Sequence, residues 1–220
     1  SRLAIDYVSS VLENEINAVT DNPVVFVDSG DVFSGGNFHG QPVAIAVDTL
    51  GIAVSELGNI SERRVAKLID PALNHGLPAF LVKTGGVNCG FMIPQYAAAA
   101  LVSENKVLAH PSSVDSIPTS AGQEDHVSMG TIGARKAAVM LSHTRSVLGI
   151  ELMSAAQAMD LQPKKAAMGK GTAAAYKVLR DKITFMENDR VLYKDQKAAA
   201  DLIADGTRVD AVEEAIGELA

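Results

Sequence analysis

The stretch from Gln123 to Leu161, QEDHVSMGTIGARKAAVMLSHTRSVLGIELMSAAQAMDL, decides the expected fold. It follows one helical pattern that is longer than an ordinary helix of a globular protein. Patterns of this length are typical of helix bundles, in which neighbouring helices cover a long apolar face. The sequence therefore predicts an all-α protein built around long helices.

Two further long helices are expected upstream of this stretch. One runs from Gln41 to Ile69, with Pro42 near its start and Asp70-Pro71 at its end. The other runs from Gln95 to Ala109. Interior glycines such as Gly51 cost about 1 kcal/mol each relative to alanine. We therefore expect the small residues of the first helix to let a neighbouring helix approach closely.

Shorter elements are expected on both sides of the long helices. An apolar spacing of three and four predicts an amphipathic helix over residues 3–20, and a short β-hairpin follows over residues 24–33. Shorter helices are expected near residues 172–184, 195–204 and 208–218. We accordingly divide the chain into a long-helix region, residues 1–161, and a C-terminal helical tail, residues 162–220.

Composition narrows the class of protein and its partners. The 220 residues are 47% hydrophobic and 20% charged, which is typical of a globular chain. A net charge of −7 without a dense basic stripe argues against nucleic acid as the main partner. Uninterrupted apolar runs fall far short of the roughly 20 residues of a membrane span. The single Cys89 and the lack of a leader-like opening favour a cytoplasmic location.

The run Thr119 to Gly130 places Gln123, Glu124, Asp125 and His126 side by side, where a loop is expected to become a helix. A helix N-terminus has unpaired N–H groups and a partial positive charge, so a carboxylate is favoured there. One interpretation is helix capping, in which Ser120 and Gln123 form a capping box. The other is chemistry, with Glu124 meeting an N–H or a cation of a substrate.

Conventional catalytic and metal motifs are missing from the sequence. It has no phosphate-binding loop and no C-x-x-C pair, and Ser34-Gly35-Gly36 lacks the frame of a nucleophile elbow. The five histidines are scattered singly, so we predict no metal site. In the loop before Gln41, Phe38 has a simple interpretation as an apolar plug, and His39 as a hydrogen-bonding partner at the helix entry.

Several segments together resemble histidine ammonia-lyases, in the order and approximate spacing of that family. They cover residues 1–161, and the tail is less similar. The segments are Glu13 to Pro23, Ser34 to Gly40 (SGGNFHG), Ser61 to Arg64 (SERR), Phe80 to Lys83 (FLVK), Gly85 to Asn88 (GGVN) and Ser120 to Met129.

The resemblance implies a fold and a reaction. The fold is the long-helix bundle of the aspartase/fumarase-like superfamily, assembled as a homotetramer. The reaction removes ammonia from L-histidine to give trans-urocanate. The family uses an electrophilic prosthetic group, 4-methylidene-imidazol-5-one (MIO), which forms from an internal Ala-Ser-Gly tripeptide and captures the substrate covalently.

This chain departs from the family at the electrophile. It contains no Ala-Ser-Gly, because Ser29-Gly30 follows Asp28 and Ser34-Gly35 follows Phe33. The family's loop with the tyrosine and arginine is missing too, and family subunits are more than twice this length. We therefore expect a C-terminal part that starts at Ser1, partners the MIO-bearing N-terminal part of the enzyme, and is inactive by itself.

The resemblance carries over the substrate-binding side. Glu124 matches the family's active-site glutamate, which implies a catalytic residue near the imidazole, either as a hydrogen-bond partner or as an acid/base. Phe38 matches a pocket aromatic, and Met92 matches a position beside the substrate side chain. The expected supporting residues are Asn37, Gln123 and His126. Because a carboxylate and an imidazole N–H make a charge-assisted bond that a phenyl ring cannot make, Glu124 favours histidine over phenylalanine.

Two alternatives stay open at this point. The first is another MIO enzyme: a tyrosine or phenylalanine ammonia-lyase, or an aminomutase. The second is an inactive helical piece that serves only in assembly.

Overall fold

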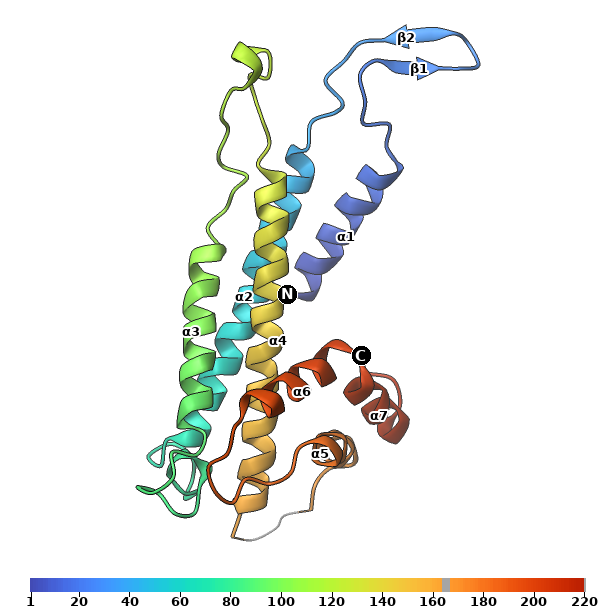
Figure 1. Ribbon diagram of the computed structural model, residues 1–220. Helices are drawn as coiled ribbons and strands as arrows, with labels where there is room; N and C mark the ends of the chain where they lie inside the picture. Colours follow the sequence, from blue (N-terminus) through green and yellow to red (C-terminus); the bar gives the residue numbers. More distant parts are fainter. Residues whose placement is uncertain (164–166, 220) are drawn as a thin grey trace. The chain divides into compact units, whose positions relative to one another are not determined.

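The computed structural model describes residues 1–163 and 167–219, and this part of the chain is mostly helical (Figure 1). Its helices are α1 (Arg2–Asn17), α2 (Gln41–Ile69), α3 (Met92–Leu108), α4 (Gly130–Leu161), α5 (Lys170–Lys182), α6 (Tyr193–Ala204) and α7 (Thr207–Ile216). Two short strands, β1 (Val24–Phe26) and β2 (Asp31–Phe33), and two 3₁₀ turns, η1 (Ala79–Leu81) and η2 (Ser120–Gly122), complete the described elements. The predicted long-helix architecture with a hairpin near the N-terminus is confirmed.

Helix α2 has the bounds that the sequence predicts, Gln41 to Ile69. Its end is fixed at Asp70, whose side chain accepts the N–H of Ala72 at 2.9 Å. The proline that follows Asp70 blocks continuation of the helix. By length and hydropathy alone α2 also meets a simple criterion for a membrane span. A buried helix of a globular core meets the same criterion, so this single match is weak support for a membrane location.

The start of α4 corrects the prediction for the Gln-Glu-Asp-His run. The helix begins at Gly130, not at Gln123, and no side-chain hydrogen bond caps η2. Local hydrogen bonds hold the preceding backbone in another shape: Thr119 and Glu124 pair with each other, and Ser116 Oγ accepts the N–H of Val127. Such bonds compete with helix formation. Glu124 therefore lies on a loop, and the expected capping box does not form.

The described part of the chain forms two compact units. Unit 1 consists of residues 1–56 and 105–141, and unit 2 of residues 57–104 and 142–220. This division follows packing within the chain. The boundary at residue 161, which follows the change from long to shorter helices in the sequence, stays a prediction. Of the predicted tail, residues 164–166 and 220 lie outside the described residues.

In unit 1, the first half of α2 packs closely against the start of α4. A Cβ on Gly51 would collide with Cε of Met140, so the expected close approach at this glycine is confirmed. Asp48 of α2 is buried, and its carboxylate accepts the N–H of Ser113 at 2.7 Å. Lys136 of α4 lies 3.9 Å from the same carboxylate. These contacts anchor the loop between α3 and α4 to both long helices.

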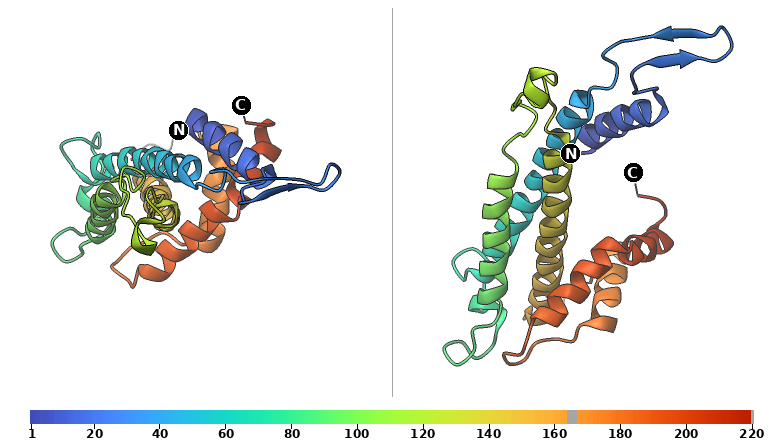
Figure 2. Two further views of the ribbon diagram at one scale, coloured as in Figure 1. Left: turned by 90° about the horizontal axis from the view of Figure 1, so that it is seen from above. Right: turned by 45° about the horizontal axis from the view of Figure 1, so that its top comes forward.

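In unit 2, two apolar clusters hold the helices together. Val65, Ala98, Val147 and Ile150 pack where α2, α3 and α4 lie side by side. The larger cluster joins α4 to the C-terminal helices through residues such as Met153 and Leu179. α5 and α7 pack together and α6 contacts both, as Figure 2 shows from two further directions.

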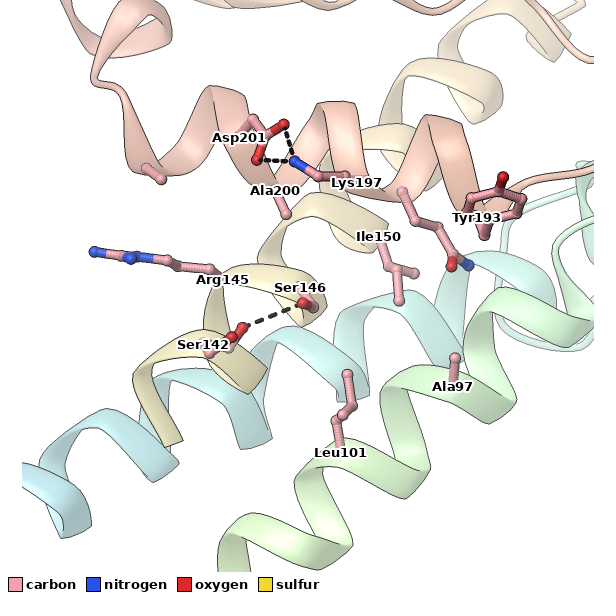
Figure 3. Close-up of a pocket in the computed structure, with 12 residues that line it drawn as sticks. Ala97, Leu101, Ser142, Arg145, Ser146, Ile150, Tyr193, Lys197, Ala200 and Asp201 are labelled. Carbon is pink, nitrogen blue, oxygen red and sulfur yellow. Dashed lines mark hydrogen bonds and ion pairs between the residues drawn. The ribbon is translucent and has the colours of Figure 1, made fainter. Parts of the chain in front are cut away.

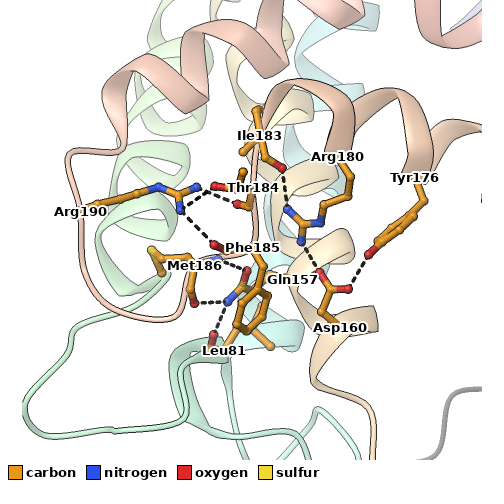
Figure 4. Close-up of polar contacts among 10 residues, drawn as sticks. All are labelled: Leu81, Gln157, Asp160, Tyr176, Arg180, Ile183, Thr184, Phe185, Met186 and Arg190. Carbon is orange, nitrogen blue, oxygen red and sulfur yellow. Dashed lines mark hydrogen bonds and ion pairs between the residues drawn. The ribbon is translucent and has the colours of Figure 1, made fainter.

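A buried glutamine and a hydrogen-bonded aspartate fix the C-terminal segments in unit 2 (Figure 4). Gln157 is 1% exposed, donates to the carbonyls of Leu81 and Met186, and accepts the N–H of Met186. Asp160 accepts Tyr176 Oη at 2.5 Å and Arg180 Nη2 at 2.6 Å. The hydrogen bond to Asp160 raises the pKa of Tyr176, and partial burial raises it further by a smaller amount. These polar contacts satisfy groups that burial would otherwise leave unpaired.

Candidate functional site

The loop before α2 carries Asn37 and Phe38, two of the predicted site residues. The turn at Asn22 anchors this loop: Asn22 Oδ1 accepts Ser34 Oγ and the N–H of Gly35, both at 3.0 Å. Asn37 donates from Nδ2 to the carbonyl of Val19 at 2.6 Å. The amide of Asn37 thus shapes the loop, whereas Phe38 is 53% exposed.

The loop before α4 carries Gln123, Glu124 and His126. Thr119 and Glu124 exchange two backbone hydrogen bonds at 3.0 and 3.3 Å and so close a tight turn over residues 119–124, the Glu124 turn. Inside the Glu124 turn, Ser120 and Ala121 have positive φ angles of 51° and 56°, which non-glycine residues rarely adopt. Such backbone outliers are concentrated at functional sites. The side chain of Glu124 is exposed, although its main chain is held in place.

His39 joins these two loops in unit 1. Its Nε2 lies 2.8 Å from the carbonyl of His126, and its Nδ1 accepts the N–H of Gln41 at 3.1 Å. The imidazole rings of His39 and His126 stack with centroids 4.9 Å apart and planes at 10°. The sequence predicts that His39 forms a hydrogen bond where α2 begins, and this prediction is confirmed. No signal in the sequence indicates the link to His126, which spans 87 residues of chain.

Met92 lies in unit 2, where it is the first residue of α3 and is half-buried. The loop before it is fixed by Asp189, whose carboxylate accepts the N–H groups of Cys89 and Gly90 at 2.7 and 2.9 Å. Gly90 has a φ of +57°, and a Cβ there would collide with the carbonyl of Phe80. The start of α3 is therefore set by a glycine and by an aspartate about 100 residues away.

The structure thus places five predicted site residues on two linked loops of unit 1, and it describes Met92 within unit 2. The contact of Phe38, Met92 and Glu124 with a substrate stays a prediction. Among the described residues, no group of three or more His, Cys, Asp or Glu side chains is arranged to hold a metal ion.

Another part of the resemblance has a structural role in unit 2. Ser61 and Arg64 of the SERR segment both bind Glu151 of α4, Ser61 Oγ at 2.6 Å and Arg64 Nη2 at 2.7 Å. The hydrogen bond to Glu151 raises the pKa of Arg64 above its usual value. Glu62, which is 2% exposed, accepts Nε2 of Gln95 on α3 at 2.8 Å. This segment therefore ties α2 to its neighbours.

A cleft of about 450 Å³ in unit 2 contains none of the predicted site residues in its lining (Figure 3). Side chains of α3, α4 and α6 form its walls. On α6, Lys197 and Asp201 pair with each other at 2.7 Å, whereas Arg145 extends away from them. The two charged residues on α6 neutralise each other, which leaves Arg145 of α4 as the remaining charged residue of the lining.

Comparison with known proteins identifies the family. The family model for aromatic amino acid lyases matches residues 1–181. The chain belongs to the aromatic amino acid lyase family. It is 62% identical over 220 residues to histidine ammonia-lyase 2 of Fusobacterium nucleatum, a match over 100% of this chain and 43% of that protein.

Solved structures of this family share the fold. The histidine ammonia-lyase of Trypanosoma cruzi superposes with a TM-score of 0.92 at 46% identity, over 98% of this chain and 42% of that one. A tyrosine aminomutase of Streptomyces globisporus gives a TM-score of 0.93 at 34% identity, over 99% and 41%. The chain therefore spans less than half the length of the lyase relatives it matches.

Proposed function

We propose that this chain is the C-terminal part of a histidine ammonia-lyase, which removes ammonia from L-histidine to give trans-urocanate together with its N-terminal part. One observation carries the proposal: Glu124 presents an exposed carboxylate from a main chain that is fixed by its pairing with Thr119. His39 links this loop to the one that carries Phe38. Catalytic groups need such preorganised supports, since small misplacements cost much of the rate.

The carboxylate gives a physical basis for substrate choice. An imidazole N–H that donates to Glu124 makes a charge-assisted hydrogen bond, which is about twice as strong as a neutral one. A phenyl ring has no donor and would leave the carboxylate desolvated without a partner. In this proposal Phe38 and Met92 contact the apolar faces of the substrate side chain, and Glu124 selects for histidine.

The electrophile has to come from outside this chain. The sequence contains no Ala-Ser-Gly, so its residues cannot form MIO, and we assign no step through that group to them. The contribution of this chain is to bind and orient the imidazole. We further propose a cytoplasmic homotetramer, in which the N-terminal part of the enzyme supplies MIO.

The TM-score of 0.93 with a tyrosine aminomutase supports a second candidate, another MIO enzyme. Two observations favour histidine instead: the 62% identity to a histidine ammonia-lyase, against 34% to the aminomutase, and the carboxylate at position 124. Steady-state assays of the full-length enzyme with L-histidine, L-tyrosine and L-phenylalanine separate the candidates. Turnover of tyrosine or phenylalanine ahead of histidine would overturn the assignment.

A substitution of Glu124 tests its role in the full-length enzyme. Glu124→Gln keeps the size of the side chain but replaces the charge-assisted bond with a neutral one. We expect kcat/KM for histidine to fall on the order of tenfold to hundredfold. Asp115→Asn removes one negative charge from an exposed position of the same connection and should leave kcat/KM unchanged. Unchanged formation of urocanate by Glu124→Gln would contradict the assigned role.

The dependence on a second segment is tested with the 23.0 kDa chain alone. We expect the pure chain to form no urocanate, and intact-mass analysis of an active sample to show additional polypeptide, in which MIO would have formed from Ala-Ser-Gly. Urocanate formation by the pure 23.0 kDa chain would show that the account of the missing electrophile is wrong.

A further inference from the structure

We propose that His39 is a positioning residue, held in its neutral Nε2–H tautomer, which fixes the Glu124 loop through the main chain of His126. The proposal deepens the assignment of Glu124 and rests on the proposed function. His39 is not expected to touch the substrate. It acts through the loop that presents the carboxylate.

The two hydrogen-bond partners of His39 define its tautomer. The backbone N–H of Gln41 can only donate, so Nδ1 of His39 must be the acceptor, without a proton. The backbone carbonyl of His126 can only accept, so Nε2 must carry the proton. The other neutral tautomer would place a donor against a donor at Gln41 and two acceptors against each other at His126. One form of the ring therefore satisfies both partners.

The two bonds connect a rigid element to the loop. Gln41 is the first residue of α2, and its N–H is one of the groups that a helix cannot pair internally. His126, whose carbonyl accepts the bond from His39, lies two residues after Glu124 in the sequence. Val127, the next residue, is held by Ser116 Oγ at 2.9 Å. The segment that follows Glu124 is thus fixed at two successive residues, one of them by His39.

A second contact shows how closely the two loops approach. A Cβ on Gly40 would lie 2.8 Å from Oγ of Ser128, so the residue after His39 is in close contact with the same segment. The stacked rings of His39 and His126 add a third contact between the loops. Loss of the bond from His39 would free the carbonyl of His126 on the exit side of the Glu124 turn, whereas the Ser116–Val127 bond and the Thr119–Glu124 pairing would persist.

Three substitutions separate the two bonds of His39 in the full-length enzyme. His39→Asn offers an oxygen near the place of Nδ1 but does not reach His126. His39→Gln offers an N–H₂ group near the place of Nε2. His39→Phe keeps a ring for stacking and makes neither bond. His110→Asn is the matched control, since this histidine is exposed in unit 1.

We expect His39→Asn to keep the melting temperature of the wild type but to lose about tenfold in kcat/KM for histidine. His39→Gln should recover most of this loss, His39→Phe should lose at least as much as His39→Asn, and His110→Asn should match the wild type. The inference is overturned if His39→Asn retains wild-type kcat/KM, or if His39→Gln falls as far as His39→Asn. It is also overturned if ¹⁵N NMR of the labelled enzyme finds a proton on Nδ1 of His39.

A double variant distinguishes this inference from the proposed function. If His39 acts through Glu124, then His39→Asn together with Glu124→Gln should lose little more activity than Glu124→Gln alone. Fully multiplied losses would overturn the inference but leave the role of Glu124 intact. An unaffected Glu124→Gln enzyme would contradict the role that the proposed function gives to Glu124, while the NMR signal would still report the tautomer of His39.

Discussion

Two polar regions of the chain, the Gln157–Asp160 region of unit 2 and the loop before α4 in unit 1, use their hydrogen-bonding groups in opposite ways. In unit 2, Gln157 and Asp160 direct their hydrogen-bonding groups to buried or half-buried partners and thereby tie the C-terminal segments to α4. In unit 1, backbone pairing and His39 fix the loop, and the carboxylate of Glu124 is left exposed. The comparison shows that Gln157 and Asp160 hold the C-terminal segments in place, whereas the groups that fix the loop before α4 leave its carboxylate exposed.

The largest effect on stability is expected at Gln157. Gln157→Ala would leave the carbonyls of Leu81 and Met186 and the N–H of Met186 without their partner, in a buried place. Each unpaired buried group costs about 1–3 kcal/mol, so we expect a loss of roughly 3–5 kcal/mol in the free energy of unfolding. Urea denaturation measures it, with Gln162→Ala at an exposed position as the control. A loss below about 1 kcal/mol would remove the contrast between the units.

A smaller effect is expected at Tyr176. Tyr176→Phe removes the bond to Asp160 and should cost about 1 kcal/mol, whereas Tyr193→Phe, at an exposed ring, should cost nothing measurable. Because folding raises the pKa of Tyr176, its contribution is fully present below the pKa of an unfolded tyrosine, near 10. It is lost as the pH rises through the folded pKa. Absorbance titration should therefore show one tyrosine that ionises late and is missing from Tyr176→Phe. Loss of a tyrosine that ionises with the others in this variant would contradict the raised pKa.

An effect on stability of similar size, joined by an effect on activity, is expected at Gly122 in the Glu124 turn. Its φ is +89°, and a Cβ would meet nothing within 4 Å, so Gly122→Ala costs only backbone strain of about 1 kcal/mol. Gly36→Ala, in equally open space and without a positive φ, is the control. We expect Gly122→Ala to lower kcat/KM for histidine more than Gly36→Ala does. Equal kcat/KM values for the two variants would mean that the Glu124 turn does not position Glu124.

The sequence predicts the regular helices well and the long-range contacts poorly. The bounds of α2 follow from a proline near its start and Asp70-Pro71 at its end, which are local signals. The predicted start of α4, at Gln123, lies too early in the chain, because the pairing of Thr119 with Glu124 competes with a helix that the local composition favours. No local pattern could show this pairing.

The site is predictable to a different degree. Resemblance to a known family indicates Phe38, Met92 and Glu124, while composition alone leaves Glu124 between capping and chemistry. The bond from His39 to His126 crosses 87 residues, and the bonds of Gln157 cross 29 and 76. A glutamine in a long helix is usually solvent-exposed, so nothing in the sequence marks Gln157 as buried.

The most direct test of the central claim is a crystal structure of the full-length enzyme with trans-urocanate bound. The account predicts that the Glu124 carboxylate accepts an imidazole N–H at about 2.7–2.9 Å. It also predicts that Nε2 of His39 stays on the carbonyl of His126. An imidazole bound by other groups, with the Glu124 carboxylate turned away from it, would contradict the account.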